Sequence, residues 1–144
     1  MAILTQNDEI RRVLASAKVV AVLGANDDPP RPAYYVPDYL HDKGFKIRPV
    51  NPAKLGTRLW GATFVASLGD VGEPIDVVDV FRRSDQLAMH VDEILALRPL
   101  PKVVWFQSGI RDGAVAKALA AAGIDVVQDR CMLQDHRRMF GQYE

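Results

Sequence analysis

The sequence predicts an α/β protein with three layers, built around a mainly parallel, doubly wound sheet of five to six strands. Two observations predict it. Short apolar runs rich in β-branched residues recur along the chain without polar alternation, as in strands that are buried on both faces. Segments with helical periodicity separate these runs, and regular alternation of strand and helix gives right-handed crossovers between parallel strands. The architecture that follows is a Rossmann-like domain.

The predicted strands follow one another at regular distances along the chain. The first covers residues 18–23, an apolar run that Gly24 closes. The same apolar, β-branched pattern recurs at residues 45–50, 76–81, 102–106 and 124–127, and more weakly around residues 63–65. These runs account for the five strands and the sixth, weaker one.

Helices are predicted before and between the strands. Asn7 or Thr5 opens the first helix, which turns Ile10, Val13 and Leu14 inward. The second contains Tyr35, Tyr39 and Leu40, and it tolerates Pro37 only if that residue lies in the first turn.

Two further helices follow in the second half of the chain. Ser84 caps the third, and Pro99 marks its end. The fourth carries apolar residues at helical spacing from Ala114 to Ala122, and Gly123 supplies the left-handed position past its end. Strand and helix therefore alternate throughout.

The composition predicts one globular domain, residues 1–144, and excludes several functional classes. The 18 Lys and Arg residues balance the 18 Asp and Glu residues, so the basic surplus that a nucleic-acid partner requires is missing. The N-terminal segment carries Asp8, Glu9, Arg11 and Arg12 within its apolar pattern, so neither a signal peptide nor a membrane span is expected.

Cysteine and histidine are too scarce for a disulfide or a metal site. Cys131 stands alone, which excludes an internal disulfide and fits a reducing cytoplasm. His41, His90 and His136 lie far apart in the chain, so no metal is expected. An exposed helix face leaves room for a homo-oligomer or an unknown protein partner, and the sequence specifies neither.

Cations follow several of the predicted strands. In an open parallel sheet, ligands bind beyond the carboxyl ends of the strands. Arg31, Lys54, Arg82 and Arg83 fall on that edge, where they suit phosphate oxygens. Each one alone fits solvated surface charge equally well, but four at successive strand ends favour a small anionic ligand.

The turn after the first strand differs from that of a dinucleotide-binding protein. Gly24 permits a tight turn and close approach of a ligand, or it simply ends the strand. The dinucleotide fingerprint needs two further glycines and an acidic residue after the second strand, and Asn51 stands at that place instead. The residues therefore disfavour NAD.

Other strand ends allow both a structural and a functional interpretation. Asn51 and Pro52 form either a purely structural turn or a wall for a nucleotide base. Gln107, Ser108 and Gly109 suit a tight turn or a cradle of backbone N–H groups. Tryptophans 60 and 105 are expected in the core rather than as stacking platforms.

One polar cluster invites a catalytic interpretation. Arg130, Arg137 or Arg138 would lower the pKa of the Cys131 thiol and make it nucleophilic. A buried, inert cysteine is the favoured alternative, and no catalytic residue is assigned.

The ordered set of motifs resembles one protein family. The motifs that carry the resemblance are VLGAN, PRP, PVNP, VDVFRR, VWFQSGI and DRC with His136. With these motifs, the chain from residue 19 to residue 138 is similar to the small stand-alone CoA-binding proteins of bacteria and archaea, and to the N-terminal CoA-binding domain of the succinyl-CoA synthetase alpha subunit.

The resemblance implies a Rossmann-like fold that binds coenzyme A. It implies that Gly24, Ala25 and Asn26 line the nucleotide end, although the family commonly has Ser where this chain has Asn26. The remaining site residues that it implies are Arg31 and Pro32, the stretch Asn51, Pro52 and Lys54, the group Phe81, Arg82 and Arg83, and the group Gln107, Ser108 and Gly109.

The synthetase depends on a ligase domain with a phosphorylated histidine, and this chain stops before such a domain. We therefore expect a non-catalytic protein that binds coenzyme A or an acyl-CoA. The alternatives are a CoA-linked thiol enzyme that uses Cys131 and an NAD(P)-binding Rossmann protein.

Overall fold

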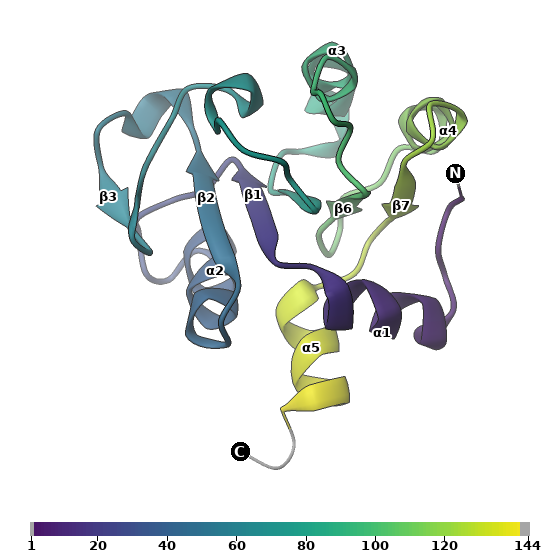
Figure 1. The fold of residues 1–144 in the computed structure, drawn as a ribbon, viewed down its shortest axis with the longest axis horizontal. Coiled ribbons are helices and arrows are strands. Elements are labelled where there is room, and N and C mark those ends of the chain that lie inside the picture. Colours follow the sequence, from purple (N-terminus) through teal and green to yellow (C-terminus); the bar gives the residue numbers. More distant parts are fainter. Residues whose placement is uncertain (1, 142–144) are drawn as a thin grey trace.

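The computed structural model describes residues 2–141, which form an α/β fold around one five-stranded parallel sheet (Figure 1). The strands run in the order β2-β1-β5-β6-β7, and every neighbouring pair is parallel. Their bounds are β1 Val19–Leu23, β2 Lys46–Val50, β5 Val77–Val80, β6 Val103–Phe106 and β7 Asp125–Val127. The predicted fold class and five of the predicted strands are therefore confirmed.

Helices cover both faces of this sheet. The α-helices are α1 Asn7–Ser16, α2 Pro32–Asp42, α3 Val91–Leu95, α4 Gly113–Ala121 and α5 Met132–Phe140. Figure 1 shows α1, α2 and α5 below the sheet and α3 and α4 above it. Short 3₁₀ segments lie at Pro52–Lys54, Leu68–Asp70 and Ser84–His90.

The central strands contribute side chains to two separate apolar cores. On β1, Val20 and Val22 pack with the layer of α1, α2 and α5, whereas Ala21 and Leu23 pack with the layer of α3 and α4. All four side chains are buried, and this explains why the strand lacks polar alternation.

The predicted sixth strand, around residues 63–65, is present only in part and is not a strand of the main sheet. Residues 58–63 form a separate antiparallel hairpin of β3 Arg58–Leu59 and β4 Ala62–Thr63, and only Val65 bridges to Val50 at the edge of the main sheet. Trp60 and Gly61 both adopt positive φ, so the chain reverses between β3 and β4, and Thr63 pairs with Arg58 of β3 instead of with the main sheet.

Two helix ends and one whole helix also differ from the predictions. Gln6, rather than Asn7 or Thr5, occupies the N-cap of α1, where its side chain and that of Glu9 form a capping box. Ser84 does not cap a helix, because its hydroxyl accepts a hydrogen bond from the backbone N–H of Arg111. Helix α5 was not predicted at all.

The order of the strands creates a switch point. The chain leaves β1, crosses through α2 to β2 on one side, and later returns to place β5 on the other side of β1. Connections therefore diverge beyond the carboxyl ends of β1 and β5, which is where open α/β sheets hold their ligands.

Candidate functional site

A cavity of about 590 Å³ lies beyond the carboxyl ends of β1, β5 and β6, and we call it the switch-point cavity. Most of the predicted site residues line it: Gly24, Asn26, Arg31, Pro32, Phe81, Arg82, Arg83, Gln107, Ser108 and Gly109. Its wall is completed by Ala33, Tyr35, Val36, Ser84, Ile110, Cys131 and Gln134. The rule that ligands bind at strand ends thus brings together residues far apart in the sequence.

Gly24 is required by the packing of the two strands at the switch point. Its φ is +87°, and a Cβ added there would lie 2.6 Å from the carbonyl oxygen of Phe81. No side chain fits at that distance, because the obstacle is backbone rather than a movable side chain. The structural interpretation of Gly24 is therefore sufficient to explain the residue.

The turn after Gly24 is tied to α2 through a proline. Pro37 was expected in the first turn of its helix. It lies in the interior of α2 instead, because the helix begins five residues earlier at Pro32. Pro37 has no N–H to offer the carbonyl of Ala33, and the backbone N–H of Asn26 donates to that carbonyl instead, at 3.2 Å. The helical hydrogen bond that is missing at Pro37 thereby leaves the Ala33 carbonyl to hold the turn from Gly24 to Asn26 in place.

Four predicted site residues do not line the cavity. Ala25 is fully buried, and its carbonyl accepts a hydrogen bond of 2.8 Å from the Asn51 side chain. The Asn51 oxygen also caps the 3₁₀ turn that begins at Pro52, by accepting from the N–H of Ala53 at 2.9 Å. These contacts support the structural interpretation of Asn51 and Pro52, which brace the loop behind Ala25.

Lys54, the fourth of these residues, is held by a neighbouring acid. Its Nζ lies 3.0 Å from Asp27 Oδ1, and the hydrogen bond from Lys54 lowers the pKa of the Asp27 carboxyl. Lys54 therefore neutralises the charge of Asp27 in the loop after β1, and it lies outside the cavity.

The three arginines of the cavity differ in how they are held. Arg31 lies 3.6 Å from Asp28 and Arg83 lies 3.3 Å from Asp85, and both pairs are exposed. Exposed pairs of this kind contribute about 0–1 kcal/mol, so a ligand can displace them. Arg82 is different, because its Nε is buried and has no hydrogen-bond partner among residues 2–141.

Asp79 lies in the middle of β5 and is not among the predicted site residues. Its side chain is fully buried, and Oδ1 accepts a hydrogen bond from Nε2 of Gln107 at 2.5 Å. Burial raises the pKa of Asp79 to about 7, although the hydrogen bond from Gln107 opposes that rise. An acid inside an otherwise apolar run was the signal that could have found this residue.

The structure supports the favoured interpretation of Cys131, an inert thiol, over the alternative in which arginines lower its pKa. Burial raises the thiol pKa instead. Arg130 donates two hydrogen bonds to the Asp135 carboxylate, at 2.8 and 3.1 Å, and Arg138 donates a third at 2.9 Å. Arg130 and Arg138 are thus engaged by Asp135, and Arg137 lies over the ring of Tyr39, although Cys131 does line the cavity.

The aromatic residues divide between core and cavity. Trp105 is fully buried, with its indole N–H donated to the carbonyl of Arg130, and Trp60 is 8% exposed beside Tyr34 and Phe64, so both belong to the core as predicted. Tyr35, which the sequence analysis placed only in a helix, is 46% exposed on the cavity wall.

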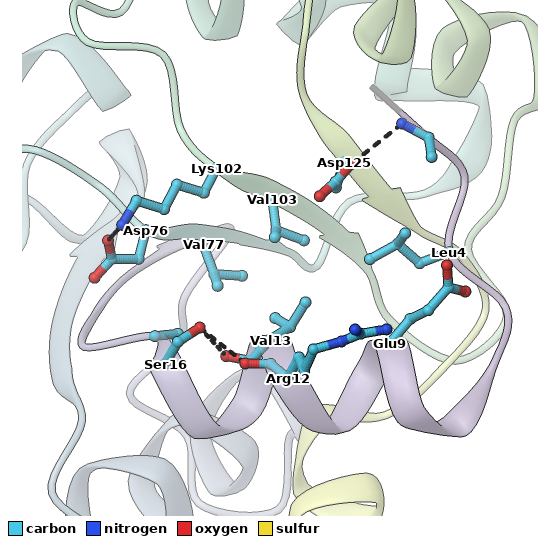
Figure 2. Close-up of a pocket in the computed structure, with 12 residues that line it drawn as sticks. Leu4, Glu9, Arg12, Val13, Ser16, Asp76, Val77, Lys102, Val103 and Asp125 are labelled. Atoms are coloured by element: carbon cyan, nitrogen blue, oxygen red, sulfur yellow. Dashed lines mark hydrogen bonds and ion pairs between the residues drawn. The ribbon is translucent and has the colours of Figure 1, made fainter.

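A second cavity, of about 500 Å³, lies at the opposite edge of the sheet, and we call it the amino-end cavity. Figure 2 shows that its charged side chains come from α1 and from the starts of the strands. Asp76 accepts hydrogen bonds from the N–H groups of Lys18 and Val19, and Glu9 belongs to the cap of α1. These polar groups are used by the fold.

Neither a metal centre nor a membrane-spanning helix is found in the described part of the chain. No three His, Cys, Asp or Glu side chains within residues 2–141 are grouped so that they could hold a metal ion. The helices over the same residues are too short or too polar to cross a bilayer.

Comparison with known proteins identifies relatives over nearly the whole chain. The model of the family described as CoA binding domain matches residues 18–137. The uncharacterized protein YneT of Bacillus subtilis (strain 168) is 35% identical over 128 residues, which are 89% of this chain and 92% of YneT.

Two solved structures show the same fold. The structure of cell-free ID.343 from Thermus thermophilus is 51% identical, with a TM-score of 0.90 over 94% of this chain and 100% of that one. A hypothetical protein from Pyrococcus horikoshii OT3 is 33% identical, with a TM-score of 0.87 over 95% of this chain and 94% of that one. With its parallel sheet, its switch-point cavity and a family match over residues 18–137, the chain belongs to the CoA-binding domain family.

Proposed function

We propose that this protein is a single, non-catalytic domain that binds coenzyme A or an acyl-CoA in the switch-point cavity. The family match supports the ligand, and the position of the cavity supports the site. The single observation that carries the choice of site is that a cavity at the switch point is lined by three arginines, one of which has a buried and unpartnered Nε.

The charges of the cavity suit the phosphates of this ligand. The guanidinium of Arg82 has a donor directed away from water and without a partner in the described part of the chain, and an unsatisfied buried donor is costly. A small shift of the Arg82 side chain on binding would bring this donor to a phosphate oxygen, which would satisfy it through a charge-assisted hydrogen bond. Arg31 and Arg83 can leave their exposed ion pairs with Asp28 and Asp85 for the diphosphate and the 3′-phosphate, and this loses little free energy.

The route of the chain around the cavity suits a nucleotide. The turn from Gly24 to Asn26 lies at the start of the crossover through α2, and the turn from Gln107 to Gly109 follows β6. Backbone groups at such turns approach a ligand without an intervening side chain. We assign the nucleotide to the first turn, and Phe81 and the second turn to the rest of the ligand.

Isothermal titration calorimetry with coenzyme A, dephospho-CoA and NAD tests this function. We expect binding of coenzyme A, weaker binding of dephospho-CoA because the 3′-phosphate is missing, and no binding of NAD. Equal affinity for dephospho-CoA would remove the role assigned to the 3′-phosphate. The absence of any heat with coenzyme A would overturn the proposal.

A pair of arginine variants decides which cavity holds the ligand. Arg82→Gln removes a charge from the switch-point cavity, and Arg12→Gln removes one from the amino-end cavity. We expect Arg82→Gln to weaken coenzyme A binding about tenfold or more, since a charged hydrogen bond contributes about 1.5–3 kcal/mol. Arg12→Gln should leave the affinity unchanged, and the opposite pattern would place the ligand at the other edge of the sheet.

A further inference from the structure

Asp79 is a buried acid whose carboxylate is half satisfied. It lies in β5 beside Val22 of β1 and Trp105 of β6, and neither neighbour carries a charge. Oδ1 accepts the hydrogen bond from Gln107, whereas Oδ2 is buried and has no hydrogen-bond partner among the described residues. Fully buried acids are rare unless they are paired, so the position calls for a reason.

Gln107 connects this acid to the switch-point cavity. The residue lines the cavity although it is only 4% exposed. The backbone is fixed on both sides, because its N–H donates to the carbonyl of Val80 and its carbonyl accepts from the N–H of Ile110. Within residues 2–141 the carboxamide forms one hydrogen bond, from Nε2 to Asp79, so Oε1 is the end left for a ligand.

The proton on Asp79 determines which end of the carboxamide can face the cavity. An ionised carboxylate only accepts hydrogen bonds, so it holds the NH₂ group of Gln107 and leaves the oxygen for the cavity. A protonated carboxyl can donate to that oxygen. The carboxamide can then turn by half a rotation and present its NH₂ group, a donor, to the cavity.

We propose that Asp79 is a positioning residue that acts through Gln107, so that binding of coenzyme A in the switch-point cavity turns a donor toward the ligand and takes up a proton at Asp79. This inference rests on the proposed function, since it takes the ligand to be coenzyme A. The proton comes from solvent, and no covalent bond changes.

The surroundings of Asp79 favour such a coupling near neutral pH. Its pKa of about 7 means that both protonation states are populated there. A bound anion adds negative charge and excludes water from Gln107, and both effects raise the pKa of Asp79 further. The titratable group that faces Asp79 from the segment before α5 is the thiol of Cys131, whose own raised pKa keeps it neutral in this range.

The sign of the pH dependence follows from linkage. The complex binds more protons than the free protein, so affinity for coenzyme A falls as the pH rises above about 7. The decrease approaches about tenfold per pH unit while the pKa of Asp79 in the complex remains above the working pH. Below this range Asp79 is protonated in both states and contributes no slope.

Calorimetry of coenzyme A binding between about pH 6 and 8.5, in buffers of different ionisation enthalpy, measures the proton uptake directly. The wild type should take up protons most strongly near the upper part of this range. Asp79→Asn should lose this uptake and bind coenzyme A more tightly than the wild type at the highest pH. Titration of the ligand phosphates is common to both proteins and cancels in the comparison.

Two further variants separate positioning from a structural role. Gln107→Leu removes the hydrogen bond that lowers the pKa of Asp79, so the acid should be protonated before the ligand binds, and the uptake should again be lost. Asp8→Asn, an exposed acid of α1, should retain the wild-type uptake. Thermal unfolding of each variant establishes that it is folded before it is titrated.

The possible outcomes distinguish the inference from the proposed function. Coenzyme A binding with equal proton uptake in the wild type and in Asp79→Asn would overturn the role of Asp79 and leave the function intact. The absence of binding by the wild type at every pH would overturn the function together with the inference.

Discussion

Replacement of Gly24 by alanine tests the packing of the switch point. The added Cβ would lie 2.6 Å from the carbonyl oxygen of Phe81 and 3.1 Å from Cδ of Arg82. Positive φ costs a non-glycine residue about 1–2 kcal/mol. Overpacking adds about 1–3 kcal/mol, because β1 and β5 must move apart.

Gly44→Ala is the matched control. Gly44 has a φ of +100°, but a Cβ there would meet nothing within 4 Å. It therefore carries the cost of positive φ without the clash. We expect Gly24→Ala to lose about 3 kcal/mol of unfolding free energy and Gly44→Ala about 1 kcal/mol.

Urea unfolding followed by circular dichroism measures both losses. The excess loss of about 2 kcal/mol in Gly24→Ala corresponds to a melting temperature about 8 °C below that of the control, at about 4 °C per kcal/mol for a domain of this size. Coenzyme A affinity should also fall for Gly24→Ala alone, since the displaced segment carries Phe81 and Arg82. Equal losses of stability in the two variants would refute the argument from close approach.

Three further predictions concern buried polar groups. Asp135→Asn should lower the free energy of unfolding in urea by about 2–3 kcal/mol, because Arg130 and Arg138 lose a nearly buried partner. Asp8→Asn, at an exposed pair, should lower it by under about 0.5 kcal/mol, and equal losses in the two variants would contradict this. Iodoacetamide should modify Cys131 in the native protein more slowly at about pH 8 than after unfolding in urea, since burial raises its thiol pKa, and equal rates would show the opposite. The native pKa of Asp79 lies above its unfolded value, so its contribution to stability is complete below about pH 4. This contribution, about 4 kcal/mol of unfolding free energy, is lost as the pH rises through about 7. Asp79→Asn should flatten this part of the pH profile of the unfolding free energy, and an unchanged profile would exclude the raised pKa.

The sequence was sufficient for the main sheet because burial on both faces leaves a direct trace in composition. A strand such as Val19–Leu23, covered by helices on either side, must be mainly apolar, and β1 and β6 show this at every position. Helix α5 left a weaker trace. Its buried Asp135 and His136 look like surface residues until Arg130, Arg138 and Tyr39 are placed beside them.

The location of the switch-point cavity also followed from the sequence, since parallel strands present their carboxyl ends at one edge. Gly24, Arg82 and Gln107 could be assigned to that edge without knowing any contact. Which cations face the cavity could not be assigned in this way, because a loop side chain is directed by its local partners. Lys54 is held by Asp27 outside the cavity, whereas Arg82 reaches the cavity wall.

The sequence by itself therefore determined the sheet, its layers and the edge where the switch-point cavity lies, because these depend on periodicity and on the order of elements along the chain. Only the tertiary structure decided the roles of Asn51, Lys54 and Asp79. Hydrogen bonding and burial act through space between residues far apart in the sequence. The 2.5 Å contact that joins Asp79 to Gln107 spans 28 positions of the chain, and no local pattern encodes it.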